Sequence, residues 1–324
     1  MKSVLNMEAC DPGICSNTLQ INEIHIGDAR HLIKKIRSES IALSIWSPPY
    51  FVGKEYEKGW TFTQWRQLLD QVIASHFNVI KPGGFMAVNI ADILCFDDLK
   101  MPRIQADNVS KRRSPVTREQ ILDVLSIEPH LNRHEVAARL GCSEQTVDRR
   151  LKNNNIRGGK YNVQTRVELV GSYIESAAYD VGLYLYDRRI WVKDPAWENS
   201  KWHSSSYRAV DEFEYLYIFW KPGITRIDRD RLSKNEWRDW GSRAVWNIPS
   251  VRANDDHPAK FPLELVKRAI LLLTDKNDIV LDPFMGSGTT AEAALVSGRN
   301  YIGIEFSPIY VALARKRASM LTFS

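Results

Sequence analysis

The chain has 324 residues, more than one small domain needs, so one large domain or two unequal ones are expected. Apolar residues make up 44% and charged residues 26%, the balance of an ordinary globular protein. No apolar run approaches the roughly 18 residues of a membrane span, and the N-terminus lacks a signal-peptide pattern, which argues against a membrane partner and for a cytoplasmic location. The four cysteines form no CxxC pair and no zinc-ligand spacing with histidine, so reduced thiols and no metal site are expected.

The first hundred residues alternate between short strands and a helix. Strands are expected over 21–26, 40–46 and 85–90, and Lys81-Pro82-Gly83-Gly84 is expected to form a turn. Residues 64–79 have helical spacing. The apolar residues that share one face of this helix are Trp65, Leu68, Leu69, Val72, Ile73 and Phe77. The alternation predicts an α/β fold with a mostly parallel sheet.

Residues 101–165 differ in character and are expected to form an inserted basic module. Between Lys100 and Arg166 there are 14 Lys and Arg residues against 7 Asp and Glu, a local net charge of +7 compared with +5 for the whole chain. Amphipathic helices are expected over 117–126 and 133–140, and a third begins after Ser143, which is suited to cap it. The charge suits a nucleic acid partner, and a solvated charged surface is the alternative.

Residues 133–152 resemble a helix-turn-helix, since small residues and Gly141 lie where the turn between two helices requires them. The second helix would present polar and basic side chains to base edges or phosphates. These candidate DNA contacts are Gln145, Thr146, Arg149, Arg150 and Lys152. The alternative is a small helical packing module that touches no DNA.

The α/β pattern resumes after the module, so residues 1–100 and 166–324 are expected to form one split domain. The expected elements of the second part are strands over 189–193 and 214–221, a helix over 262–273, a strand over 279–282, a glycine-rich loop and helix, a strand over 301–305 and a helix over 308–321.

The loop after the strand 279–282 has the composition of a nucleotide-binding turn. Glycines such as Gly286 and Gly288 let a backbone approach a ligand closely, and the helix that follows presents its N-terminus to electron-rich groups. Glu305 ends the next strand, 23 residues after Asp282, where a carboxylate can accept hydrogen bonds from ribose hydroxyls. A nicotinamide dehydrogenase would share this pattern, but the 19 residues after Glu305 leave no room for its second mononucleotide-binding half. A glycine turn that serves only packing is the remaining alternative.

Ser47-Pro48-Pro49-Tyr50 directly follows the strand 40–46, at the strand end where open α/β sheets bind ligands. Two prolines remove two N–H donors and leave carbonyl acceptors. Ser47 Oγ and the Pro48 carbonyl could hold both hydrogens of an exocyclic amine, with the nitrogen lone pair directed at a methyl donor. Tyr50 offers a stacking face for a base taken out of the duplex. The alternative is a proline turn that merely closes the strand.

Taken in order, these motifs resemble the amino-methyltransferases of restriction–modification systems, in the permuted order with the catalytic motif ahead of the cofactor motif. The other matching segments are Ile26-Gly27-Asp28, Lys81-Pro82-Gly83-Gly84, Arg189-Ile190-Trp191 and His257-Pro258-Ala259-Lys260-Phe261-Pro262. The resemblance implies a Rossmann-like α/β sheet of seven mostly parallel strands, S-adenosyl-L-methionine as cofactor and double-stranded DNA as substrate. In this family Ser at the first catalytic position is typical of cytosine-N4 enzymes, and Asp or Asn of adenine-N6 enzymes.

The resemblance also implies roles for individual residues. Ser47, Pro48, Pro49 and Tyr50 would be catalytic. Asp28 would contact the adenine of the cofactor, Asp282 and Phe284 would line its pocket, and Glu305 would hold the ribose. The further cofactor-binding residues would be Gly286, Ser287, Gly288 and Thr289 in the loop, and Lys260, Phe261 and Pro262 near the methionine end.

A target-recognition region is implied at about 195–256. Seven of the ten tryptophans fall between Trp191 and Trp246, with several arginines among the later ones. Trp237, Arg238 and Trp240 are candidate DNA contacts, although aromatic residues there could equally belong to the core.

The resemblance further implies a prokaryotic enzyme at the nucleoid, with a cognate restriction endonuclease encoded nearby. Adenine-N6 methylation, a non-catalytic helix-turn-helix regulator, and methylation of RNA or of a protein amide remain as alternatives. The oligomeric state and the recognition sequence stay open.

Overall fold

The computed structural model describes residues 18–51, 59–102, 114–152, 164–196, 208–251 and 261–322. The chain divides into two compact units. The larger unit contains the described residues up to Cys95, those from Val167 to 196 and those from Ala209 onward, and the smaller unit is centred on Phe96–Arg166. Within the described residues, no helix is both long enough and apolar enough to cross a bilayer.

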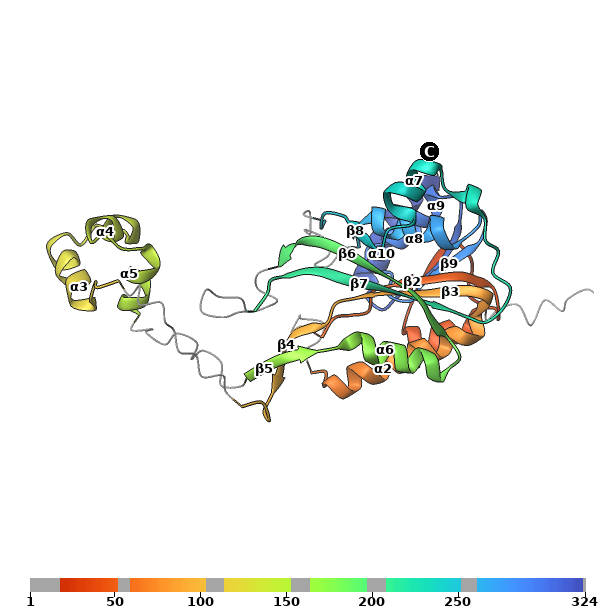
Figure 1. The fold of residues 1–324 in the computed structure, drawn as a ribbon, viewed down its shortest axis with the longest axis horizontal. Helices are drawn as coiled ribbons and strands as arrows, with labels where there is room; N and C mark the ends of the chain where they lie inside the picture. Colours follow the sequence, from red (N-terminus) through yellow and green to blue (C-terminus); the bar gives the residue numbers. More distant parts are fainter. Residues whose placement is uncertain are drawn as a thin grey trace, which may run out of the picture. The chain divides into compact units, whose positions relative to one another are not determined.

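An eight-stranded sheet forms the centre of the larger unit (Figure 1). In spatial order its strands are β1 (Glu23–Ile26), β10 (Asn300–Glu305), β9 (Ile279–Asp282), β2 (Ile41–Trp46), β3 (Ile80–Ile90), β7 (Asp211–Trp220), β6 (Tyr184–Ala196) and β8 (Val245–Asn247). The first five strands run parallel, whereas β7 is antiparallel to both of its neighbours. The mostly parallel α/β sheet is thus confirmed, and its extra strand is the three-residue β8, which pairs parallel with β6.

The strand β2 occupies the middle of the sheet. All six of its residues are buried, as expected of a parallel strand covered on both faces. Its register against β3 shifts, since Ile41 pairs with Ile80 and the next pair is Leu43 with Phe85. The turn predicted at Lys81–Gly84 therefore interrupts the ladder within β3 instead of preceding the strand.

Helices cover both faces of the sheet. Figure 1 shows α2 (Phe62–Val79) and α6 (Val170–Asp180) together on one face, and α8 (Leu263–Leu273) and α9 (Thr289–Val296) on the other. The last helix, α10 (Pro308–Thr322), packs against α9 and β1. The shorter helical segments of this unit are α1 (Ala29–Leu32), the 3₁₀ turns Ile33–Lys35 and Arg229–Arg231, α7 (Lys234–Glu236) and a π-helical turn at Trp237–Gly241.

The start of α2 has a local cause. Thr61 accepts a hydrogen bond from the backbone N–H of Gln64 (3.2 Å), while the Gln64 side chain accepts one from the backbone N–H of Thr61 (2.9 Å). This capping box satisfies two donors that would otherwise lack partners. The apolar face predicted from the spacing is confirmed, because Trp65, Leu69 and Ile73 are all buried.

Three short helices form the smaller unit: α3 (Arg118–Ile127), α4 (Arg133–Arg139) and α5 (Glu144–Leu151). Side chains of Thr117, Asn132 and Ser143 cap them, as the sequence predicts for Ser143. Their core consists of Val116, Ile121, Val136, Ala137 and Val147. A separate two-stranded sheet consists of β4 (Ile93–Asp98) and β5 (Gln164–Glu168).

Candidate active site

Residues from distant parts of the sequence meet at one edge of the sheet. Asp28 follows β1, Ser47 follows β2, Asp282 ends β9 and Glu305 ends β10. These four strands are parallel neighbours, so their carboxyl ends lie along the same edge. Ligands of open α/β sheets bind at this edge.

Asp282 organises the loop after β9. Its side chain is 2% exposed; Oδ1 accepts a hydrogen bond from the Phe284 backbone N–H (2.9 Å), and Oδ2 accepts one from Thr290 Oγ1 (2.5 Å). Burial raises the pKa of this carboxyl to about 7, against the opposing effect of the two hydrogen bonds. Asp282 therefore holds the loop to the first turn of α9, and its role in lining a cofactor pocket stays a prediction.

Glu305 bridges two loops. Its Oε2 accepts from the backbone N–H of Gly286 (2.8 Å) and its Oε1 from that of Ser307 (2.8 Å). A carboxylate has about four acceptor positions, so the half-buried Glu305 can still accept from further hydroxyl groups.

Two glycines of the loop adopt left-handed backbone conformations, and one of them permits close packing. Gly286 and Gly288 both have positive φ, at 52° and 89°. A Cβ at Gly288 would lie 2.8 Å from Cα of Ala314 in α10, so this glycine permits close helix packing. The neighbouring side chains of Ser287 and Thr289 are buried within the loop.

The β1 side of the edge combines a carboxylate with exposed apolar groups. Asp28 caps α1 and pairs with Arg30 (2.5 Å), whose hydrogen bond lowers the pKa of the carboxyl. Ile26 is 52% exposed and lies opposite Glu305 in the β1–β10 ladder, and Phe306 is 76% exposed.

The hydrogen-bond acceptors and apolar side chains at this edge fit an adenosyl group. The carboxylates of Asp28 and Glu305 can accept from amino and hydroxyl groups. The apolar side chains of Ile26, Phe306 and the half-buried Phe284 can contact a planar base.

The Ser47–Tyr50 segment is held by hydrogen bonds from several elements. Ser47 Oγ donates to the Tyr50 hydroxyl (3.0 Å), and that hydroxyl donates to Glu214 Oε2 in β7 (2.6 Å). The Trp65 indole of α2 donates to the Pro49 carbonyl (2.6 Å). Because Pro49 is engaged in this way, Ser47 Oγ and the Pro48 carbonyl are the acceptors of the segment suited to an incoming amine.

Sequence reasoning missed the buried polar cluster beneath Tyr50. Asn89 Nδ2 in β3 donates to the Tyr50 hydroxyl (3.2 Å) and to Glu214 Oε2 (2.5 Å). Lys193 Nζ in β6 donates to Glu214 Oε1 (2.7 Å) and to Asp211 Oδ2 (3.3 Å). The available signal was Glu214 itself, which directly precedes the apolar part of β7 and lies on the same face as Leu216 and Ile218.

The cluster shifts the pKa values of two of its members. Burial raises the pKa of Tyr50 well above its usual value, and the adjacent Glu214 carboxylate adds to the effect. Burial opposes protonation of Lys193, but Glu214 and Asp211 outweigh it and raise the pKa of the ammonium group. Lys193 therefore stays charged and compensates the buried Glu214.

The remaining cofactor candidates precede α8. Pro262 occupies the N-cap position of that helix, and Phe261 is partly buried against the main core. Lys260 lies outside the described residues.

The candidate DNA contacts of the smaller unit differ in what they touch. Gln145 and Arg149 are exposed. Lys152 is exposed and pairs with Asp148 (3.0 Å), and Thr146 Oγ1 lies 3.0 Å from Ser143 Oγ at the start of α5. Arg150 donates to the Val116 carbonyl (3.1 Å), a contact that stabilises the unit itself.

The candidate DNA contacts of the larger unit differ in how deeply they are buried. Trp240 is 8% exposed and lies edge-on to Trp246 in the core, so its burial speaks against a DNA contact. Trp237 donates to the Arg229 carbonyl (2.8 Å), and the exposed Arg238 pairs with Asp239 (2.7 Å).

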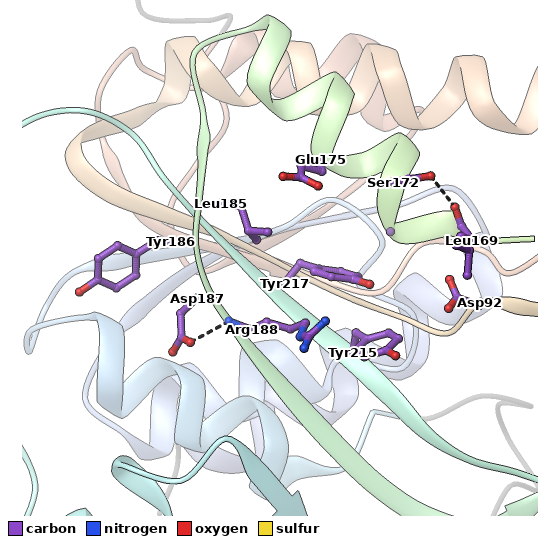
Figure 2. A pocket seen from close by; sticks show the side chains of 11 residues that line it. Asp92, Leu169, Ser172, Glu175, Leu185, Tyr186, Asp187, Arg188, Tyr215 and Tyr217 are labelled. Atoms are coloured by element: carbon purple, nitrogen blue, oxygen red, sulfur yellow. Dashed lines mark hydrogen bonds between the residues drawn. The ribbon is translucent and has the colours of Figure 1, made fainter.

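A cavity of about 580 Å³ lies between α6 and the strands β6 and β7, and Figure 2 shows its lining. Tyr215 and Tyr217 line it, together with Asp92, Glu175 and Arg188. Successive residues of a strand point to opposite faces, so this cavity and the Glu214 cluster lie on opposite faces of β7.

Comparisons with known proteins agree with this architecture. The chain is 62% identical to the type II methyltransferase M.BglI of Bacillus subtilis over 306 residues, which cover 94% of this chain and 88% of that protein. Its fold is similar to that of TTHA0409 from Thermus thermophilus, solved with S-adenosyl-L-methionine (TM-score 0.60, 23% identity, 92% and 93% coverage). It is also similar to the fold of the cytosine-N4-specific PvuII DNA methyltransferase (TM-score 0.54, 19% identity, 94% and 92% coverage). The model of the N6/N4 DNA methylase family matches residues 41–316, so the chain belongs to this family of S-adenosyl-L-methionine-dependent DNA methyltransferases.

Proposed function

We propose that this protein transfers the methyl group of S-adenosyl-L-methionine to N4 of a cytosine in double-stranded DNA, as the modification enzyme of a type II restriction–modification system. The observation that carries the base assignment is Ser47, a neutral hydroxyl at the first catalytic position. The resemblance associates Ser at this position with cytosine-N4 enzymes.

The hydrogen bonds around Ser47 support this assignment. The Ser47 hydroxyl donates to Tyr50, so its hydrogen is directed away and its lone pairs can accept from an amine. With the Pro48 carbonyl as a second acceptor, both amine hydrogens are held and the nitrogen lone pair is directed at the methyl donor. Tyr50 would stack against the base, which has to leave the duplex to reach the edge of the sheet.

The cofactor would supply an electrophilic methyl group, and the chain's own residues would position it. Asp28 and Glu305 would accept hydrogen bonds from its adenosine part, with Ile26, Phe284 and Phe306 as apolar neighbours. Asp282 would act through the loop, because both of its oxygens hold Phe284 and Thr290.

The type II assignment is supported by the relation to M.BglI and implies a cognate endonuclease. In the smaller unit, Gln145, Arg149 and Lys152 are the exposed candidates for DNA contacts. The non-catalytic regulator is no longer favoured, because the family match and the assembled edge point to methyl transfer.

The test is product analysis. DNA incubated with the enzyme and S-adenosyl-L-methionine is digested to nucleosides and separated by mass spectrometry, with Ser47→Ala as the matched control. N4-methylcytosine in the wild-type sample alone is expected, and single-molecule sequencing of the same DNA then gives the recognition site. An RNA competitor should leave the yield unchanged, and a complete lack of DNA methylation would contradict the proposed function.

Adenine-N6 methylation is the second candidate, because the matching family model covers both N6 and N4 enzymes. The same digest decides between them. N6-methyladenine would overturn the cytosine assignment and leave DNA methylation intact.

A further inference from the structure

A directed chain of hydrogen bonds leaves the catalytic segment. Ser47 Oγ donates to the Tyr50 hydroxyl (3.0 Å), and the Tyr50 hydroxyl donates to Glu214 Oε2 (2.6 Å). Both bonds point the same way, from the acceptor proposed for the amine to a carboxylate. An ionised carboxylate only accepts hydrogen bonds, so the chain ends there.

Glu214 is buried and paired with a lysine. It is 7% exposed, and Lys193 Nζ lies 2.7 Å from its Oε1 while also bonding Asp211. Asn89 Nδ2 donates to Oε2 from β3 (2.5 Å). Burying a carboxylate is costly unless a cation and hydrogen-bond donors compensate it. The ion pair with Lys193 places a buried, compensated carboxylate beside Ser47–Tyr50, and buried charged groups of this kind mark functional sites.

Methylation of an exocyclic amine requires a proton acceptor. The amine nitrogen uses its lone pair to form the new N–C bond, the C–S bond of the methyl donor breaks, and its electron pair stays on sulfur. The nitrogen then carries a positive charge and one hydrogen too many. Its N–H bond must break, with the electron pair returning to nitrogen.

We propose that Glu214 is the terminal acceptor of this proton, and that the hydroxyls of Ser47 and Tyr50 carry it there. The amine proton passes to Ser47 Oγ as the Ser47 hydrogen moves to Tyr50 and the Tyr50 hydrogen moves to Glu214. One proton leaves nitrogen and one neutral carboxylic acid forms, so the step needs no further reactant. The proton is released to solvent after the product base leaves. The proposal rests on the proposed role of Ser47–Tyr50 in binding the amine, and holds for cytosine or adenine.

Two conservative substitutions interrupt the path at different points. Glu214→Gln retains an oxygen that can accept from Tyr50 but removes the proton acceptor. Tyr50→Phe keeps the aromatic face but removes the hydroxyl between Ser47 and Glu214. Glu212→Gln is the matched control, because Glu212 is an exposed residue of the same strand.

The primary measurement is the single-turnover rate of methyl transfer at saturating DNA and cofactor. Each variant should lose about 100-fold or more, the range of general acid–base catalysis, and the double variant should be no slower than the slower single one. Glu212→Gln should match wild type. Calorimetric affinity for S-adenosyl-L-methionine should stay within about twofold in all variants.

A second readout does not depend on turnover. Tyrosine labelled with ¹³C at Cζ reports ionisation of Tyr50 by NMR, with Tyr50→Phe assigning the signal. Removing the Glu214 charge should lower the pKa of Tyr50, because that charge is one of the causes of its elevation. An unchanged Tyr50 titration in Glu214→Gln would show that the contact is not made, and would overturn the path.

Other outcomes are equally decisive. A wild-type rate in Glu214→Gln or in Tyr50→Phe would overturn the proposal, and a loss of cofactor affinity equal to the loss of rate would assign Glu214 to binding. Product analysis of wild-type enzyme tests the proposed function separately, since it detects methylated DNA whatever the variants do.

Discussion

The burial of Asp282 predicts how the stability of the protein changes with pH. Its carboxyl is buried, and its pKa is about 7 in the folded protein compared with 3.8 for an ordinary aspartate. The folded state therefore binds this proton more tightly than the unfolded chain, so the contribution of Asp282 to stability is largest at low pH. It is lost as the pH rises toward 7.

The magnitude follows from the slope of about 1.4 kcal/mol per pH unit for one proton. Between pH 5 and pH 7 this Asp is ionised in the unfolded chain and mostly neutral in the folded protein. The unfolding free energy therefore falls by about 3 kcal/mol over this range. Asp282→Asn cannot ionise, and its amide can still accept from the Phe284 N–H and donate to Thr290 Oγ1. Relative to wild type, the variant should therefore gain about 3 kcal/mol in unfolding free energy between pH 5 and pH 8.

Urea unfolding followed by tryptophan fluorescence measures this difference. All ten tryptophans lie outside Phe96–Arg166, so the signal reports on the larger unit. Asp180→Asn, at an exposed position at the end of α6, is the control and should differ from wild type equally at both pH values. The reasoning is refuted if the Asp282→Asn variant also shows the same difference at pH 5 and pH 8.

Three further variants test the candidate active site and the candidate DNA contacts. Tyr50→Ala should nearly abolish methyl transfer, since a base–aromatic stack of about 1–3 kcal/mol is lost, while cofactor affinity measured by calorimetry stays close to wild type. Normal turnover in this variant would contradict a stacking role for Tyr50. Glu305→Ala should weaken S-adenosyl-L-methionine binding by about 1.5–3 kcal/mol, the range for hydrogen bonds to a charged group, and unchanged calorimetric affinity would contradict the cofactor site. Joint replacement of Arg149 and Lys152 by Ala should reduce the log–log salt dependence of DNA binding by up to about 0.9 per lost phosphate contact, at an unchanged catalytic rate on saturating DNA. A salt dependence equal to that of wild type would show that Arg149 and Lys152 make no phosphate contacts. Slow methylation by a variant that binds DNA normally would show that the module helps to form the active site.

Local signals in the sequence determined most of the elements. The helix α2 and the helices of the smaller unit were predicted because capping residues and apolar spacing act within a few residues of each other. The helix α6 was missed, and its N-cap, Leu169, makes no side-chain capping bond that could mark its start. The three-residue β8 was missed for a related reason, since so short a segment has no periodicity to detect.

Tertiary packing decided which candidates are accessible. Trp240 and Arg150 are of the residue types that contact DNA, but Trp240 is buried against Trp246 and Arg150 bonds the Val116 carbonyl. Residue type alone cannot separate these cases, because an aromatic ring or a guanidinium suits both a core and an interface.

The candidate active site shows the same division between local signals and tertiary structure. The sequence by itself was enough to select Ser47–Tyr50, the loop after Asp282 and Glu305 at the end of β10 as candidate site residues. Each of these is a contiguous motif that follows or ends a recognisable strand. The cluster around Glu214 depends on strands separated by more than a hundred residues, and only the antiparallel pairing of β7 with β3 brings Glu214 to Asn89 and Tyr50. Apart from an acidic residue on an apolar face of its strand, such an acceptor has no local signature, because a lysine from a third strand compensates its charge and the whole sheet buries it.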